Sequence, residues 1–178
     1  MNKNYPIYKT TFIDDMSSLV EESAHNFPDS IAISYKDKPS DKEVKKVTFP
    51  QWRDDVRHLG TALIANGLRE ENIAIIGENY YGWCCAFFAV MGIGSVTVPV
   101  DKELPIEDID GIITTTACKA VIYGKTAEEK IKELLKNGGL QSVELFISIE
   151  PKTSIDDSCL GNKKLVSVTE LEENGAEL

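Results

Sequence analysis

The side chains of this sequence that could act as nucleophiles, bases or metal ligands are its four cysteines and two histidines. A cysteine nucleophile needs an adjacent base and a third group that orients the base. Nothing in the sequence places Cys84 or Cys85 beside His25 or His58, and the cysteines form no C-x-x-C pair and have no histidine at zinc-ligand spacing. The sequence therefore predicts free thiols that fill the core, histidines at the surface or its boundary, and no metal site.

Glycine loops that could bind phosphate are the next candidates. Gly92-Ile93-Gly94 has two glycines of a dinucleotide loop, but the third glycine is missing and the pair precedes a predicted strand instead of linking a strand to a helix. The sequence contains no P-loop ending in Lys-Ser or Lys-Thr, and Thr114-Thr115-Thr116 lacks the flanking glycines that would let it wrap around a phosphate. We interpret the glycine pair as a packing turn and the threonines as the end of a helix.

The carboxylates suggest one further kind of site. Phe12-Ile13-Asp14-Asp15 is an apolar pair followed by an acidic pair, as at the magnesium site of a phospho-receiver domain. That site also needs an aspartate after a later strand, whereas the predicted strand 72–77 is followed by Glu78-Asn79, and a helix N-cap explains Asp14 more simply. A receiver-like switch therefore stays an alternative. The other carboxylate clusters lie at predicted helix starts or in loops: Glu70-Glu71, Glu107-Asp108-Asp110, Glu128-Glu129 and Glu172-Glu173.

The elements that must position any site include helices whose apolar residues recur at three- and four-residue steps. This spacing predicts a first helix over 14–27 and, after a capping box formed by Thr48 and Gln51, a second helix that ends at Asn66-Gly67. Further helices are predicted at three places: after Tyr80, from Pro105, and from a second capping box formed by Thr126 and Glu129.

Short runs of β-branched and other apolar residues predict strands between these helices. The predicted strands span 31–35, 44–49, 72–77, 95–99, 119–123 and 143–149. The first two form a hairpin, and the later ones alternate with helices, which is typical of right-handed βαβ crossovers on a largely parallel sheet. The predicted fold class is therefore α/β, with helix, sheet and helix layers over residues 1–150. A polar, acidic segment follows over 151–178, with one short helical turn capped by Ser167 and Glu170.

The segment from Tyr80 to Val100 has no charged residue, and its length matches that of a membrane span. Gly92 and Gly94 interrupt its helical half, and the β-branched residues before Pro99 are typical of a strand. We therefore expect a helix, a glycine turn and a buried strand here, and no transmembrane span.

Composition and charge argue against several classes of protein. With 42% hydrophobic and 27% charged residues, the chain has the composition of a globular protein. Its formal net charge of −10 repels a nucleic-acid backbone, whose binding depends on Lys and Arg. The start MNKNYPIYKT has no apolar segment that could act as a secretion signal, so we expect a protein of the reducing cytoplasm.

The order of these segments over residues 10–125 resembles that in adenylate-forming enzymes, and most of all that in bacterial long-chain fatty-acid–CoA ligases. Thr48 to Trp52 is similar to the family's Thr-Tyr-x-x-Leu helix opening, and Ile73 to Asn79 to its strand ending in Glu-Asn. Gly92 to Asp101 resembles the family's glycine turn and following strand, which ends in Pro and Asp. Lys102-Glu103 departs from the proline-rich version of amino-acid-activating members, which favours the fatty-acid branch.

The resemblance implies a two-step reaction, in which ATP and a fatty acid give an acyl-adenylate and CoA then displaces AMP. It implies ATP, Mg²⁺ and CoA as cofactors, and the remainder of a longer polypeptide as the partner. The family's phosphate loop, Thr-Glu motif, ribose-binding Asp and catalytic Lys have no counterpart in these 178 residues. The resemblance therefore assigns no catalytic, cofactor-binding or metal-binding residue to this chain and implies that it is inactive alone. A stand-alone α/β module for small-ligand binding or protein interaction is the alternative.

The apolar stripes predict one shared core that includes Trp52, Leu59, Leu63, Ile75, Phe87 and Val98. We expect Ile75→Ala to lower the free energy of unfolding by about 2–5 kcal/mol, because it removes packed methyl groups from an interior strand. Denaturant or thermal unfolding measures this change. A melting temperature equal to that of the unaltered chain contradicts the predicted core.

Overall fold

The computed structural model describes residues 12–38 and 40–178, and in them the chain forms one five-stranded parallel sheet and one two-stranded antiparallel hairpin. The hairpin consists of β1 (Ile31–Tyr35) and β2 (Lys45–Thr48). The large sheet has the strand order β4-β3-β5-β6-β7. Its strands are β3 (Asn72–Ile76), β4 (Val96–Val100), β5 (Ala120–Tyr123), β6 (Leu145–Ser148) and β7 (Lys164–Ser167).

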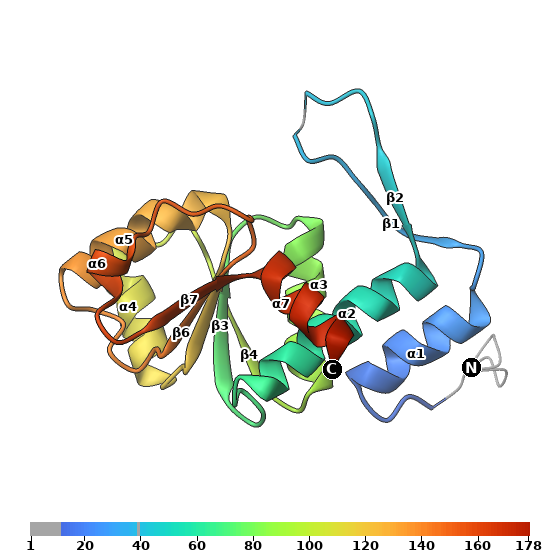
Figure 1. Cartoon of the computed structure of the whole chain (residues 1–178), viewed down its shortest axis with the longest axis horizontal. Helices are drawn as coiled ribbons and strands as arrows, with labels where there is room; N and C mark the ends of the chain where they lie inside the picture. The colour runs from blue at the N-terminus through green and yellow to red at the C-terminus, as the bar shows by residue number, and fades with distance from the viewer. Residues whose placement is uncertain (1–11, 39) are drawn as a thin grey trace, which may run out of the picture.

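Helices cover both faces of the large sheet, as Figure 1 shows. One face carries α1 (Met16–Asn26), α2 (Phe49–Ala65), α3 (Tyr81–Gly92) and α7 (Val168–Glu177). The other face carries α4 (Ile106–Thr115), α5 (Glu128–Lys136) and α6 (Asp157–Leu160), with a 3₁₀ turn η1 (Lys125–Ala127) before α5. The predicted α/β class and its three layers are therefore confirmed.

The side chains of the central strands divide between two cores, because successive residues of a strand point to opposite faces. In β3, Ile73 and Ile75 pack towards α2 and α3, and Ala74 and Ile76 pack towards α4 and α5. All four are fully buried. A run buried on both faces has no polar alternation, which is why this strand is an unbroken apolar sequence.

The predicted shared core is confirmed in part. Trp52, Leu59, Leu63 and Ile75 are buried in one cluster, and Phe87 packs against that cluster while only partly buried. The prediction is wrong for Val98, which is partly buried against the cluster on the opposite face. Its strand, β4, lies at the edge of the sheet, and alternation along the strand turns Val98 away from α3.

The capping box predicted at the start of α2 is confirmed. The Thr48 N–H donates to Gln51 Oε1 at 2.9 Å, and the Gln51 N–H donates to Thr48 Oγ1 at 3.4 Å. The helix ends at Asn66, and Gly67 adopts the left-handed conformation with φ of 76° that closes it.

Two predicted helix caps are wrong. The N-cap of α1 is Asp15 instead of Asp14, and Asp15 Oδ1 accepts the Ser18 N–H at 2.7 Å. Thr126 does not cap α5, which begins at Glu128 without a side-chain cap. The Thr126 N–H instead donates to Glu78 Oε1, a residue 48 positions earlier, at 3.2 Å. A tertiary contact has thus replaced the local one.

The stretch 151–178 contains more structure than the single turn expected from the sequence. β7 pairs in parallel with β6, and α7 follows it for ten residues across α2, where Val168 and Leu171 are buried. Ser167 caps α7 by accepting the Glu170 N–H at 3.1 Å, as predicted. The division of the chain at residue 150 stays a prediction.

The uncharged segment 80–100 forms α3, a turn at Gly94 with φ of 79°, and β4, which confirms helix, turn and strand. None of the helices in residues 12–38 and 40–178 is both long and apolar enough to cross a membrane.

The packing of α7 on α2 depends on one glycine. A Cβ atom on Gly175 would lie 1.9 Å from the His58 carbonyl oxygen, which is main chain and cannot rotate away. We therefore expect Gly175→Ala to lower the free energy of unfolding by about 1–3 kcal/mol through overpacking. Gly111→Ala in α4 is the matched control, because nothing lies within 4 Å of a Cβ there. It should leave stability unchanged or raise it by up to about 1 kcal/mol. Equal effects of both variants in urea unfolding contradict the close approach.

Candidate functional site

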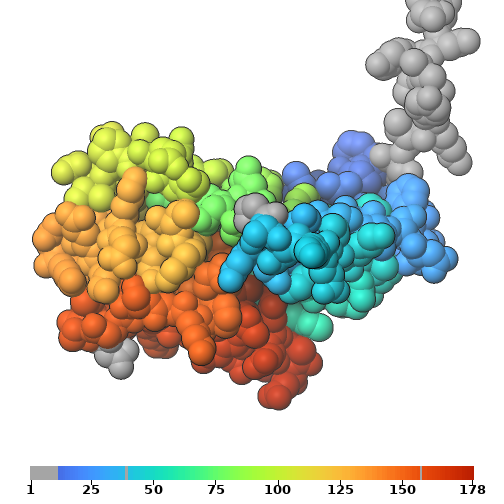
Figure 2. Space-filling view, turned by 90° about the horizontal axis from the view of Figure 1, so that it is seen from above, coloured from blue at the N-terminus to red at the C-terminus, as the bar shows by residue number. Residues whose placement is uncertain are grey.

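Open α/β sheets bind ligands beyond the carboxyl ends of the strands, at the point where the strand order reverses. In this sheet the reversal lies between β3 and β5, because β3 leads through α3 to β4 on one side and the chain then crosses through α4 to β5 on the other. The segments after these two strands are Gly77 to Asn79 and Gly124 to Thr126, which we call the switch-point loops. Figure 2 shows the green β3–α3 part of the chain between the yellow-green and orange α4 and α5 on one side and the cyan hairpin on the other.

The switch-point loops touch each other directly. A Cβ atom on Gly77 would lie 2.9 Å from the Gly124 nitrogen, and a Cβ atom on Gly124 would lie 3.3 Å from the Gly77 Cα. Such distances leave no room for a side chain at either position, so both glycines are required by this approach. The crevice that holds a ligand in many folds of this type is closed here by main chain.

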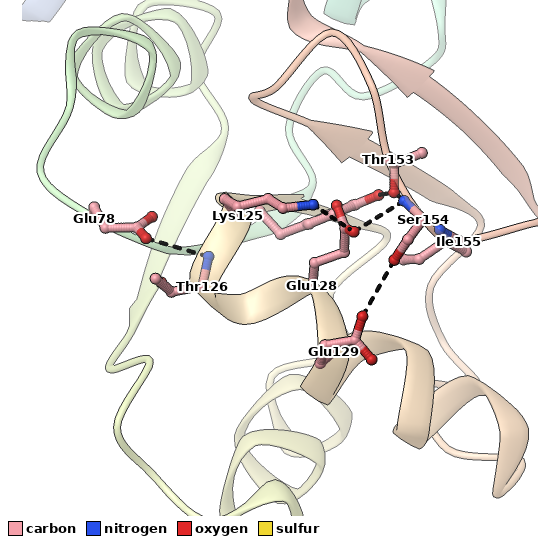
Figure 3. A network of polar contacts seen from close by, with 9 residues as sticks. Glu78, Lys125, Thr126, Glu128, Glu129, Thr153, Ser154 and Ile155 are labelled. Atoms are coloured by element: carbon pink, nitrogen blue, oxygen red, sulfur yellow. Dashed lines mark hydrogen bonds and ion pairs between the residues drawn. The ribbon is translucent and has the colours of Figure 1, made fainter. Parts of the chain in front are cut away.

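Glu78 completes the closure. Its carboxylate lies against Gly124, at 2.6 Å from the position of a Cβ atom there, and its Oε1 accepts the Thr126 N–H (Figure 3). Its Oε2 is buried and accepts no hydrogen bond from the described residues. Unpaired N–H groups at the start of a helix attract anions. At the entry to η1 and α5 the chain supplies this anion itself, from the loop after β3.

Glu128 anchors the next loop to the same edge. Its side chain is 1% exposed and accepts the Lys125 ammonium at 3.0 Å and the Ser154 N–H at 2.9 Å. Burial opposes its ionisation, but the hydrogen bonds from Ser154 and Lys125 outweigh burial and hold the pKa of Glu128 below its ordinary value. Ser154 Oγ also donates to Glu129 Oε1 at 3.3 Å, as Figure 3 shows. These hydrogen bonds hold the 125–129 segment against Ser154. The carboxylates of Glu128 and Glu129 make this region negatively charged, and negative charge repels a triphosphate.

A surface pocket of about 460 Å³ opens beside the switch point, between the carboxyl ends of β3 and β4. We call it the Trp83 pocket. Trp83 of α3 and Pro99 and Val100 of β4 form its apolar part, and the Trp83 ring stacks on Phe87 with centroids 5.3 Å apart. The polar residues of the pocket are Gly77, Glu78, Asn79, Asp101 and Lys102. Lys102 is paired with the neighbouring Glu103, so the pocket has walls for an apolar group but no nucleophile with a base.

A second cluster of titratable groups lies where α2, α3 and α7 meet. The Tyr81 hydroxyl donates to Asp55 Oδ2 at 2.6 Å, and the Tyr81 ring stacks on Tyr35 of the hairpin with centroids 5.0 Å apart. Burial raises the pKa of Tyr81, so the hydroxyl stays a donor. Burial, and then the charge of Asp55, raise the pKa of Glu172 to about 7. This cluster joins three helices and the hairpin.

The thiols do not form a reactive centre. All four are free; Cys85 and Cys118 are buried, as expected of core residues, and Cys84 and Cys159 are half-buried. Burial raises the pKa of Cys84, Cys85 and Cys118, which keeps these thiols protonated and poorly nucleophilic. His25 is exposed and His58 half-buried, as predicted. No group of three or more His, Cys, Asp or Glu residues in the described part of the chain is placed to hold a metal ion.

The roles of Glu78, Glu128 and Glu172 differ from the sequence-based predictions, which placed these residues in solvated clusters or in a family pattern. A signal for Glu78 existed, because a carboxylate that directly follows a buried strand and a glycine lies at the ligand edge of a parallel sheet. Nothing local distinguishes Glu128 or Glu172 from their exposed neighbours Glu129 and Glu173.

The chain is similar in sequence to members of one enzyme family. The sequence profile of the family described as AMP-binding enzyme matches residues 20–174. The putative acyl–CoA ligase YdaB of Bacillus subtilis is 25% identical over 130 residues, which is 68% of this chain and 25% of that protein. Nonribosomal peptide synthetase 32 of Fusarium pseudograminearum is 25% identical over 154 residues, which is 86% of this chain and 2% of that protein. The chain thus spans a quarter or less of these two relatives.

A solved structure has the same fold. The A domain of carboxylic acid reductase from Segniliparus rugosus, in complex with AMP and a co-purified carboxylic acid, superposes with a TM-score of 0.78 at 13% identity. The superposition covers 95% of this chain and 31% of that chain. At this identity the likeness concerns the fold.

The half-buried carboxyl of Glu172 makes the stability of the fold depend on pH. Its folded-state pKa of about 7 lies above the ordinary value of 4.5, so its protonated form is favoured by folding. This contribution is fully present below pH 4.5 and is lost as the pH rises through 7. At neutral to alkaline pH we expect Glu172→Gln, which mimics the protonated form, to be more stable than the unaltered chain by about 1–2 kcal/mol, because solvent screens part of the effect at a half-buried carboxyl.

Urea unfolding from pH 4.5 to 8.5 measures this difference. Glu173→Gln is the matched control, because Glu173 is the exposed neighbour on the same helix, and it should leave the pH profile unchanged. Parallel profiles of the Glu172→Gln chain and the unaltered chain contradict the raised pKa.

Proposed function

Because this chain belongs to the AMP-binding enzyme family, we propose that it is the N-terminal part of an ATP-dependent ligase that converts a carboxylate into its CoA thioester. In this proposal ATP and the carboxylate give an acyl-adenylate and pyrophosphate, and the CoA thiolate then displaces AMP. The chain acts as a scaffold and is inactive without the remainder of a longer polypeptide. The quarter of YdaB that it spans supports this view of a part of a larger enzyme.

The filled switch point is the observation that carries the scaffold role. Adenylation needs hydrogen-bond donors and a cation around the transferred phosphate, each able to supply several kcal/mol of transition-state stabilisation. The switch-point loops offer the reverse, since Gly77 and Gly124 are in contact and Glu78 places a carboxylate at the helix entry. These residues do not fit a nucleotide triphosphate or its magnesium ion. We therefore assign no step of the reaction to a residue of this chain, and leave ATP, Mg²⁺ and CoA to the remainder.

A long-chain fatty acid is the proposed substrate. Lys102-Glu103, which differs from the proline-rich segment of amino-acid-activating relatives, supports this class, and the name of YdaB as a putative acyl–CoA ligase supports an acyl substrate. The similarity to a peptide synthetase makes an amino acid the competing substrate. The free thiols agree with the reducing cytoplasm as the proposed location.

Carboxylate-dependent exchange of labelled pyrophosphate into ATP tests the proposal. We expect no exchange with residues 1–178 alone, because the part of them that the structure describes offers no phosphate site, and exchange above the no-enzyme control with the full-length polypeptide. A panel of palmitate, acetate and amino acids distinguishes the substrate classes, and palmitate should give the fastest exchange. Exchange by residues 1–178 contradicts the scaffold role, and no exchange with any carboxylate by the full-length polypeptide contradicts the ligase.

A further inference from the structure

The outer edge of β4 carries backbone groups that no strand of the described residues pairs with. The Val96 N–H donates to the Glu71 carbonyl at 3.0 Å, on the side of β3. Because backbone groups alternate along a strand, Val98 and Val100 also face β3, and Thr97 and Pro99 face away. No strand within residues 12–38 and 40–178 pairs with β4 on that side. The edge therefore presents one N–H, that of Thr97, and the carbonyls of Thr97 and Pro99.

The composition of β4 is that of a strand with neighbours on both sides. Exposed sheet edges are usually blunted with charged residues, above all lysine, which prevent another strand from pairing. The strand Val-Thr-Val-Pro-Val has no charge, and Val96 is 57% exposed. Pro99 costs no ladder bond, because its missing N–H lies on the outer side. Within β4, Pro99 is the only residue of a type that hinders pairing with another strand.

The Trp83 pocket lies beside the same edge. Pro99 and Val100 belong both to β4 and to the pocket, and Trp83 of α3 forms the opposite wall. α3 has no charged residue, and its aromatic residues Trp83, Phe87 and Phe88 are only half-buried. A helix that is apolar on all sides is normally covered on all sides. Trp83, Pro99 and Val100 therefore give the pocket an apolar part beside the strand edge, and Asp101 and Lys102 are among its polar lining.

We propose that the outer edge of β4 and the Trp83 pocket together receive one extended segment from the remainder of the polypeptide. The segment pairs with β4 as a further strand of the sheet and places an apolar side chain between Trp83 and Pro99. Backbone hydrogen bonds supply affinity in this mode, and the pocket supplies specificity. The inference rests on the proposed function, since the occupant is the part that relatives such as YdaB have and this chain does not span.

Amide hydrogen exchange tests the proposal at single residues. It is measured on the polypeptide in the full length that its native source makes and on residues 1–178 produced alone. We expect the Thr97 amide to exchange at least about 100-fold more slowly in the full-length polypeptide, because only there does it donate to a partner strand. The Val98 and Val100 amides, which face β3, are the internal controls and should be protected in both.

Three results overturn the proposal. The first is a Thr97 amide that exchanges equally fast in both samples, including the case in which the native polypeptide ends at Leu178. The second is a Thr97 amide already protected in dilute residues 1–178. The third is protection in residues 1–178 that grows with protein concentration, which identifies a second copy of this chain as the occupant.

A pair of variants gives an independent measurement. Thr97→Pro removes the outward N–H and no bond to β3, whereas Val98→Pro removes an N–H that faces β3. We expect Thr97→Pro to lower the melting temperature of the full-length polypeptide by several degrees and to change that of residues 1–178 little, while Val98→Pro lowers both. If Thr97→Pro changes the melting temperature of the full-length polypeptide as little as that of residues 1–178, the proposed docking is contradicted.

The failure of this inference is distinguishable from failure of the proposed function. Pyrophosphate exchange by a full-length polypeptide whose Thr97 amide is unprotected keeps the ligase and removes the docked strand. A full-length polypeptide whose Thr97 amide is protected but which does not catalyse pyrophosphate exchange keeps the docked strand and removes the ligase.

Discussion

The contact between Gly77 and Gly124 is the constraint on which this end of the molecule depends. It holds the loops after β3 and β5 so close that a Cβ atom on Gly77 would reach within 2.9 Å of the opposite main chain. Glu78 can then bridge to the Thr126 N–H, and η1 takes the place of a regular first turn of α5. Because these loops meet at the reversal of strand order, the contact also closes the position at which folds of this type bind ligands. The loops at the carboxyl ends of β3 and β5 are therefore held against each other and carry the negative charge of Glu78.

The edge strand β4 lies to one side of the closed switch point. Within residues 12–38 and 40–178, β5 and β6 are buried throughout and β3 is buried except at Asn72, whereas β4 has a neighbouring strand on one side only. The absence of charge from Tyr80 to Val100 would also be expected of a segment that crosses a membrane. The structure gives it a different reason, since one part covers the sheet and the other forms its edge. Its apolar character agrees with a lobe that has further protein against α3 and β4.

β7 forms the opposite edge of the sheet. β7 adds the last strand and α7 returns across α2, where Gly175 permits main-chain contact with His58. This approach also brings Glu172 near Asp55, which accepts the Tyr81 hydroxyl, so that the Glu172 carboxyl is half-buried beside a like charge. Close helix packing and an unfavourable charge therefore arise from the same contact.

The sequence by itself determined the elements, because helix periodicity, the Thr48–Gln51 capping box and the turns at Gly67 and Gly94 are set by residues within a few positions of one another. It also determined the α/β class, through the alternation of helices with apolar strands. Only the tertiary structure decided the strand order, which placed β4 at the edge and turned Val98 to the far face. It likewise gave the Thr126 N–H to Glu78, 48 residues away, and buried Glu128 but not Glu129. Such choices follow from contacts between distant segments, whose energies exceed local preferences and leave no pattern in the nearby residues.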